Sequence, residues 1–145
     1  MPKVLIMQGI PGSGKTNFAR KLVEGRADWV RINRDDLRNM RGDYWVPKQE
    51  SLITEFEYVC LKAAMENGYN VVYDSTNLNP KTIQGVIKVI DKHNFLDPNA
   101  EPYKVEYQMM DTPLDVCIER DSKRERPVGA AVITNFYNRY VKKDE

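Results

Sequence analysis

The sequence predicts a three-layer α/β fold, in which helices cover both faces of a parallel sheet of about four strands. Short apolar segments alternate with amphipathic segments of the length that parallel strands need between them. The first apolar segment leads directly into a glycine-rich loop, and each later one ends in polar residues. Because ligands bind beyond the carboxyl ends of parallel strands, these polar ends should form one functional rim.

The four strands are expected where apolar residues run together and are bounded by turn residues. They are residues 3–8, 29–33, 70–74 and 103–110. Helices are expected where apolar residues recur at spacings of three and four. They are residues 15–24, 34–41, 48–67, 80–93, about 113–125 and about 129–142.

Local signals predict how three of these helices begin. Asn33 should cap the helix that follows it, and Asp36 is placed to reach back to that cap. Pro80 suits the first turn of its helix. Thr112 is expected to cap a helix that Pro113 begins.

Composition limits the class of protein. The chain has 145 residues, which suits a single domain over residues 1–145. Its formal net charge is +1, so a nucleic-acid contact would need a local basic cluster. Cys60 and Cys117 lie in apolar helical patterns without metal-ligand spacing, which predicts free thiols in a reducing compartment such as the cytoplasm. We expect no leader peptide and no membrane span, because no apolar run approaches about 18 residues.

A phosphate-binding loop is the most specific motif. Gly9, four residues, Gly14, Lys15 and Thr16 stand between a predicted strand and a predicted helix, which is the context that the motif needs. Backbone N–H groups and the helix N-terminus would bind phosphates, Lys15 would bridge the outer ones, and Thr16 would bind Mg²⁺. The expected nucleotide contacts are Gly12, Ser13, Gly14, Lys15 and Thr16. The loop predicts ATP or another nucleoside triphosphate with Mg²⁺, without distinguishing a kinase from a hydrolase.

Two acids follow the second strand. Acids in a first helical turn complement the helix dipole, and this structural explanation accounts for Asp36 better than for Asp35. Asp35 is left to face the rim, with Arg38 three residues later on nearly the same side. A carboxylate beside a guanidinium suits a kinase in which the acid accepts a hydroxyl proton and the cation holds a phosphate of the acceptor. A purely structural role is the alternative for Asp35.

The third strand ends on Asp74, an acid that in phosphate-loop proteins usually orients Mg²⁺ directly or through water. Thr76 and Asn77 follow it, and they either contact a substrate or form an ordinary turn. A segment rich in Arg and Lys later precedes a Pro–Gly break, which is typical of a mobile lid over about residues 118–130. Arg120 and Arg124 are four residues apart, so on a helix they would share one face and could close over phosphates.

In combination, the strings "GIPGSGKT", "INRDDLR", "DSTNLNP" and "ERDSKR" resemble the kinase domain of phage-type 5′-polynucleotide kinases over nearly the whole chain. The resemblance implies a P-loop kinase fold with a helical lid. It also implies that Asp35 is the general base, that Arg38 binds the acceptor phosphate and that Arg124 contacts the donor phosphates. Thr76 would lie near the acceptor strand. In that family the acid directly precedes the "TN" pair, whereas here Asp74 stands one residue earlier.

The leading hypothesis is therefore an ATP-dependent kinase that acts on the 5′-hydroxyl end of RNA or DNA. A local basic and aromatic patch could follow a single strand, although its members could equally be solvated or packed in the core. The patch is Arg31, Arg34, Arg38, Arg41, Tyr44 and Trp45. Two alternatives stay open: a kinase for a small hydroxyl compound such as a nucleoside or sugar nucleotide, and a nucleotide-binding module without phosphotransfer. The sequence leaves a ligase or phosphatase partner and the oligomeric state open.

Overall fold

The computed structural model describes residues 2–40, 42 and 47–142, and it contains the expected parallel sheet. The strands are β1 (Lys3–Gln8), β2 (Trp29–Asn33), β3 (Asn70–Asp74) and β4 (Lys104–Met109). They pair in the order β2-β3-β1-β4, and every pair is parallel. The predicted fold class is thus confirmed.

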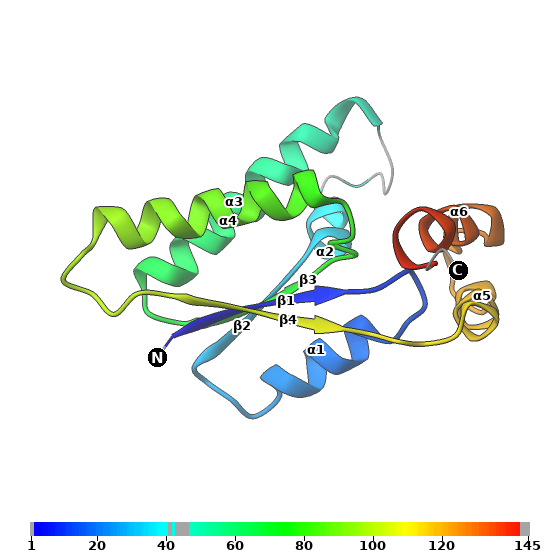
Figure 1. The fold of residues 1–145 in the computed structure, drawn as a ribbon, viewed down its shortest axis with the longest axis horizontal. Helices are drawn as coiled ribbons and strands as arrows, with labels where there is room; N and C mark the ends of the chain where they lie inside the picture. The colour runs from blue at the N-terminus through cyan, green and yellow to red at the C-terminus, as the bar shows by residue number, and fades with distance from the viewer. Residues whose placement is uncertain (1, 41, 43–46, 143–145) are drawn as a thin grey trace.

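Helices cover both faces of this sheet. The helical elements are α1 (Lys15–Val23), α2 (Arg34–Asn39), η1 (Pro47–Gln49), α3 (Glu50–Glu66), α4 (Pro80–Leu96), α5 (Leu114–Ser122), α6 (Ala130–Phe136) and η2 (Tyr137–Val141). In Figure 1, α1 lies on one side of the sheet and α3 and α4 lie on the other. The α5 and α6 helices stand beyond the carboxyl ends of the strands, where the sequence places its polar rim.

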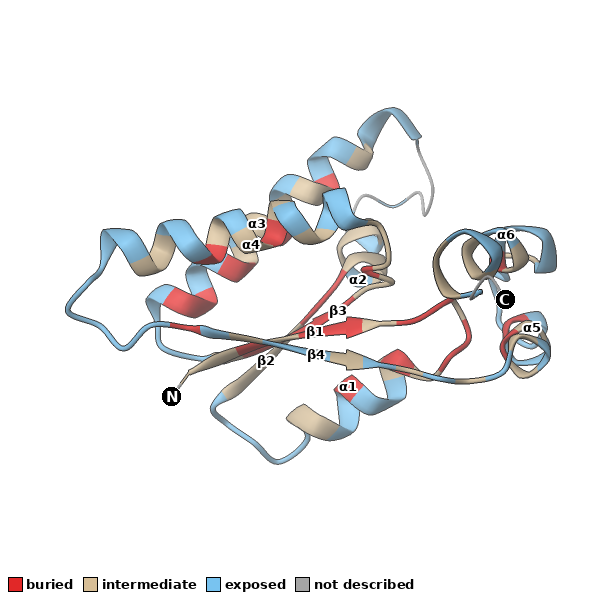
Figure 2. Ribbon diagram, in the orientation of Figure 1, coloured by how far each residue is buried: buried red, intermediate tan, exposed pale blue. Residues whose placement is uncertain are grey.

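The core is built on the two central strands. Val4 and Ile6 of β1 and Val71 and Tyr73 of β3 are fully buried, and they pack under α3 and α4. Met7 and Val72 point to the opposite face and pack under α1. Figure 2 shows this burial in the middle of the sheet, whereas β4 at its edge is mostly exposed. The continuous apolar runs of β1 and β3 therefore reflect strands that are covered on both faces.

The helix that follows β4 differs from the prediction at both ends. Thr112 does not cap it: Pro113 is the cap residue, and the Thr112 hydroxyl donates to the Ser13 carbonyl at 2.6 Å. The helix ends at Ser122 rather than near residue 125, so Arg120 and Arg124 do not share a helix face. The Thr112 hydroxyl thus bonds a carbonyl that is distant in sequence instead of capping its own helix.

The α3 helix buries a different face from the one that apolar spacing suggests. Val59 belongs to the apolar residues spaced at three and four but is 65% exposed, while Glu57 is only 3% exposed. Cys117 is buried, Cys60 is half-buried, and both are free thiols. Within the described ranges, no helix combines the length and the apolar character that crossing a membrane requires.

Candidate active site

The phosphate-binding loop joins β1 to α1. Glycine is required at two of its positions by backbone conformation and by lack of space for a side chain. Gly12 and Gly14 have φ angles of 83° and 97°, which side-chain-bearing residues rarely adopt. A Cβ atom on Gly12 would also lie 2.3 Å from the Cys117 carbonyl oxygen. Gly14 is the N-cap of α1 and brings no capping side chain. The first N–H groups of α1 are therefore left for an anion.

Lys15 is buried at the start of α1. Its Nζ donates to the carbonyl oxygens of Gly9 at 2.9 Å and Ile10 at 3.0 Å, so it lies across the loop. Burial lowers the pKa of Lys15 to about 8, although the negative charge of Asp74 works in the opposite direction. Burial therefore makes the charged form of Lys15 unfavourable in the free chain, and a bound phosphate would stabilise that charge.

This pKa predicts proton uptake when ATP binds. The phosphates favour the charged ammonium group and should raise the pKa of Lys15, so the complex holds more protons than the free chain above pH 8. We expect an uptake of about 0.9 proton per ATP at pH 9 and about 0.1 at pH 7. ATP affinity should therefore be constant below the pKa of about 8 in the free chain, fall above it, and level off above the higher pKa of the complex.

Calorimetric titration with Mg²⁺-saturated ATP, in two buffers with different ionisation enthalpies, measures this uptake. The titration at pH 7 is the internal control, because Lys15 is already charged there. Equal binding enthalpies in both buffers at pH 9 would contradict the assignment.

Asp74 lies beside the loop and is 1% exposed. Its Oδ2 accepts hydrogen bonds from Thr16 Oγ1 at 3.1 Å, Arg31 Nε at 2.9 Å and Asn33 Nδ2 at 3.0 Å. Its Oδ1 is buried without a hydrogen-bond partner among the described residues. A carboxylate oxygen left in this way beside the Thr16 hydroxyl fits the oxygen ligands that Mg²⁺ prefers, so these two residues would hold the ion directly or through water.

Arg31 connects this acid to the start of α2. Its NH1 group lies 2.7 Å from Asp36 Oδ2. The Asn33 side chain caps α2 as expected, with Oδ1 accepting from the Asp36 backbone N–H at 2.9 Å. The Asp36 carboxylate pairs with Arg31 instead of reaching back to the cap, which corrects the sequence-based expectation.

Replacing Arg31 by Met should destabilise the fold. Arg31 is 12% exposed and Asp74 is almost fully buried, so the variant leaves a buried carboxylate with two partners instead of three. Breaking one side of such a pair costs about 3–5 kcal/mol in the free energy of unfolding. Asp36→Asn removes only the exposed ion pair between Arg31 and Asp36, and it should cost less than about 1 kcal/mol in the free energy of unfolding. Urea unfolding at pH 7 measures both, and equal losses would contradict the prediction.

Asp35 and Arg38 meet on one side of α2, as their spacing predicts. Arg38 NH1 lies 2.6 Å from Asp35 Oδ1. Glu50, at the start of α3, accepts from Nε and NH2 of the same guanidinium. Burial works to lower the pKa of Arg38, but the hydrogen bonds with Glu50 and Asp35 raise it above its ordinary value. Arg38 is therefore a fixed cation with two carboxylate neighbours.

A second ion pair stands behind the first. Arg34 donates from NH1 to Glu57 Oε1 at 2.8 Å and from NH2 to the Glu50 backbone carbonyl at 2.8 Å. Burial raises the pKa of Glu57 against the opposing effect of Arg34. Arg31, Arg34 and Arg38 are thus all paired with acids. The other three members of the predicted patch, Arg41, Tyr44 and Trp45, lie outside the described residues.

The loop after β3 is tied to the phosphate-binding loop. Asn77 is 2% exposed and has a positive φ of 48°. Its Nδ2 donates to the carbonyl oxygens of Met7 at 2.7 Å, Ser75 at 3.1 Å and Tyr73 at 3.3 Å. The amide group of Asn77 therefore braces the loop, a role that the predicted substrate contact did not include. The Gly9 N–H also donates to the Thr76 carbonyl at 3.1 Å.

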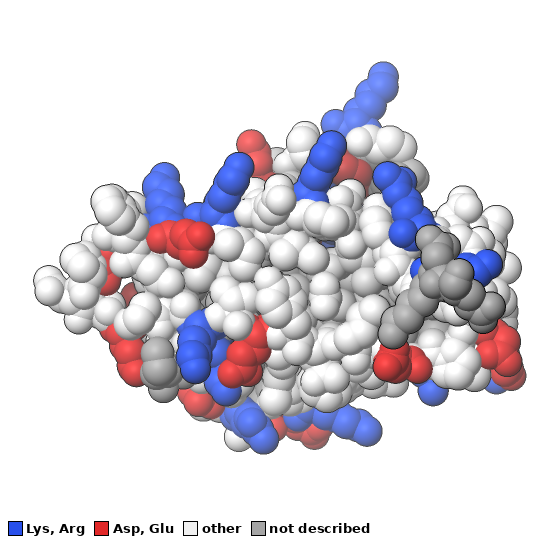
Figure 3. All heavy atoms as spheres, viewed as in Figure 1, with Lys and Arg blue, Asp and Glu red and all other residues white. Residues whose placement is uncertain are grey.

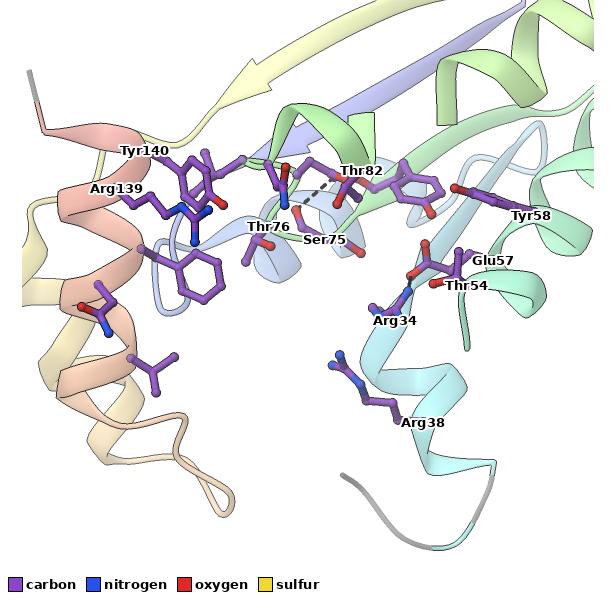
Figure 4. A pocket seen from close by; sticks show the side chains of 17 residues that line it. Arg34, Arg38, Thr54, Glu57, Tyr58, Ser75, Thr76, Thr82, Arg139 and Tyr140 are labelled. Carbon is purple, nitrogen blue, oxygen red and sulfur yellow. Dashed lines mark hydrogen bonds and ion pairs between the residues drawn. The ribbon is translucent and has the colours of Figure 1, made fainter. Parts of the chain in front are cut away.

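A pocket of about 560 Å³ opens above this loop. Figure 4 shows Arg34 and Arg38 on one side of it, Arg139 and Tyr140 on the opposite side, and Ser75 and Thr76 between them. The α3 side chains Thr54, Glu57 and Tyr58 close the pocket further in. The predicted residues Arg38, Thr76 and Asn77 all line it.

The predicted lid arginines lie on the donor side. A Cβ atom on Gly14 would stand 3.5 Å from Arg120 NH1, so this guanidinium lies over the loop. The positive charge of Arg124 contributes to the lowered pKa of Lys15. Asp121 is 1% exposed and accepts from the backbone N–H groups of Val128 and Gly129, both at 2.9 Å. This carboxylate thereby joins the end of α5 to the start of α6.

Several pocket residues were missed from the sequence. Glu57 gave a weak signal, because it lies four residues from both Ile53 and Leu61 on the buried stripe of α3. Tyr58, Arg139 and Tyr140 gave none, since their helices reach the pocket through tertiary packing. The pocket is therefore richer in aromatic and cationic groups than the motifs indicate.

Known proteins are similar to this chain over most of its length. The chain is 30% identical over 158 residues to the "Putative bifunctional polynucleotide kinase/RNA ligase" of Autographa californica nuclear polyhedrosis virus, covering 97% of this chain and 21% of that protein. It is 24% identical to the L-seryl-tRNA(Sec) kinase of Methanococcus maripaludis, covering 94% of this chain and 52% of that kinase. A chain in the solved Pnkp1/Rnl/Hen1 RNA repair complex superposes with a TM-score of 0.77 at 29% identity, over 94% of this chain and 43% of that chain.

The chain thus spans about a fifth to a half of the length of these relatives. A family model described as an AAA domain, AAA_33, matches residues 4–142. The match runs from β1 through η2 and includes the phosphate-binding loop, the residues that line the pocket of about 560 Å³ and the predicted lid arginines. The chain belongs to the AAA_33 family and is a nucleotide-binding P-loop kinase domain, similar to those of polynucleotide kinases.

Proposed function

We propose that this kinase domain transfers the γ-phosphate of ATP to the 5′-hydroxyl end of RNA or DNA. The observation that carries the proposal is the contact of Asp35 with Arg38 on α2, where Arg38 NH1 lies 2.6 Å from Asp35 Oδ1. Asp35 is close enough to influence the pKa of Lys15, and Arg38 lines the acceptor pocket. An acid near the donor lysine and a cation at the acceptor suit transfer to a hydroxyl next to a phosphate.

Each residue then has a definite task. Asp35 accepts the proton of the attacking hydroxyl, and Arg38 holds the neighbouring phosphate of the acceptor. Lys15 and Arg124, with Arg120, neutralise charge on the donor phosphates. Mg²⁺, bound by Thr16 and Asp74, would supply further neutralisation between the outer phosphates.

Binding of an acceptor phosphate to Arg38 would compete with the Glu50 carboxylate. It now holds two of the donors of Arg38 that a phosphate would use. An acceptor phosphate must therefore displace it or share the guanidinium with it. A dianionic or bridging phosphate can compete for Arg38, whereas an acceptor without a phosphate beside its hydroxyl gains nothing from it.

A kinase for a small hydroxyl compound is the second candidate, because a pocket of this volume suits a single small ligand. One assay separates the two. The chain is incubated with γ-labelled ATP, Mg²⁺ and one of three acceptors: a 5′-hydroxyl oligonucleotide, a nucleoside 3′-phosphate or a nucleoside. Label on the first two and not on the nucleoside supports the proposal. Label on the nucleoside alone supports the second candidate, and label on none of them in repeated assays excludes the proposed acceptor.

A further inference from the structure

We propose that a row of lysines on α4 binds the phosphate backbone of a single-stranded nucleic acid whose 5′ end lies in the acceptor pocket. The row is Lys81, Lys88 and Lys92, named here the α4 lysine row. This inference rests on the proposed function and extends it, because it makes the acceptor a polynucleotide rather than a mononucleotide.

The three lysines share one side of the helix. Lys81 and Lys88 are about two helical turns apart, and Lys92 follows one turn later, so their side chains align within roughly 20° of a common line. All three are exposed, and no ion pair with another described residue involves them. Asp91, the one acid of α4, lies roughly 80° around the helix from this line. The row is therefore a line of positive charge that no ion pair neutralises within the described part of the chain.

The first lysine of the α4 lysine row lies next to residues that line the acceptor pocket. Asn79, which caps α4, and Thr82 in its first turn both line the pocket, and Lys81 stands between them in sequence. Figure 3 shows Lys and Arg side chains standing in a row over α4. A strand that leaves the pocket along this helix would meet one lysine after another.

The length of the row favours a chain over a single small acceptor. The pocket of about 560 Å³ has room for the end of a strand, within the roughly 300–1,000 Å³ typical of small-ligand sites. From Lys81 to Lys92 the helix rises about 16 Å. That length matches about five phosphates at a stacked rise of ~3.4 Å each. The lysines therefore add contacts only for acceptors of several nucleotides.

Salt dependence tests the proposal directly. Binding of a 3′-labelled, 5′-hydroxyl single-stranded 10-mer is followed by fluorescence anisotropy between 50 and 200 mM KCl. The triple variant Lys81→Gln/Lys88→Gln/Lys92→Gln should bind about tenfold or more weakly at 50 mM. The slope of log affinity against log salt should become shallower by about 2, from three lost contacts on a single strand.

Two matched variants serve as controls. Arg20→Gln/Lys21→Gln/Arg26→Gln removes three positive charges from the α1 side of the sheet and should leave the slope unchanged. The triple Lys→Arg variant of the row keeps the charges and should bind as the original chain does. In the kinase assay, the Gln variant of the row should raise KM for the 10-mer and leave the kinetics on a nucleoside 3′-phosphate unaltered.

Two results would contradict the proposal that the α4 lysine row binds a strand. One is an unchanged salt slope in the Gln variant of the row, and the other is an equal change of slope in the α1-side variant. The binding measurement does not depend on catalysis. If no 5′-hydroxyl acceptor is phosphorylated, the proposed function fails, while the anisotropy series still decides whether the lysines bind a strand.

Discussion

Asp35→Asn is expected to lower kcat for phosphate transfer to a 5′-hydroxyl end by about 10²–10⁴-fold, the usual contribution of a general base. The amide has nearly the shape of the carboxylate and can still contact Arg38, so the acceptor site should stay assembled. Asp35 lies on α2, outside the phosphate-binding loop that would hold ATP. We therefore expect KM for ATP to change by less than about threefold.

Steady-state kinetics with a 5′-hydroxyl oligonucleotide measure this loss, and calorimetry measures ATP binding. Asp36→Asn is the matched control, because the neighbouring acid pairs with Arg31 on the exposed side of α2. It should retain kcat within about threefold, since it removes no contact to a reacting group. If Asp35→Asn turned over near the original rate, Asp35 would not be the base.

Lys15→Met is the second variant with a large expected effect, and it should separate activity from stability. Loss of a preorganised charge at the donor phosphates should lower kcat/KM by about 10²–10³-fold. Burial holds the pKa of Lys15 to about 8, so the protonated lysine opposes folding at neutral pH. Methionine removes that cost, and we expect Tm to stay the same or rise, as happens at sites where function is kept at the expense of stability.

Thermal unfolding without nucleotide, compared with the same experiment at saturating ATP, tests both halves. The original chain should be stabilised by ATP, whereas the Met variant should lose most of that shift. A lower Tm for the Met variant without nucleotide would mean that Lys15 serves the loop rather than the phosphates.

The parts of the fold that depend on local sequence were predictable. The strands β1, β2 and β3 have the expected bounds, because continuous apolar runs and turn residues mark buried parallel strands. The Asn33 cap was also predictable, since a cap and its N–H partner are three residues apart. The proximity of Asp35 and Arg38 followed in the same way from helical spacing.

Features that depend on distant partners were not predictable. Thr112 has the sequence of a cap, yet the Ser13 carbonyl takes its hydroxyl. The fixed orientation of Arg38 depends on Glu50, twelve residues away, and the Arg31–Asp74 pair joins residues 43 apart. Nothing in a single sequence selects among several arginines and acids for such pairs. The donor loop was therefore predicted in detail, whereas the acceptor walls were not.

The bracing of the β3 loop against the phosphate-binding loop has an evolutionary consequence. Through the Gly9–Thr76 hydrogen bond and the Asn77 amide, the loop that lies under the pocket is fixed to the phosphate-binding loop as one hydrogen-bonded unit. The pocket walls come instead from side chains of α2, α3, α6 and η2. Substitutions in those walls can change which hydroxyl compound is accepted while the reacting distance is preserved. One chemical centre can in this way be inherited unchanged by enzymes with different substrates.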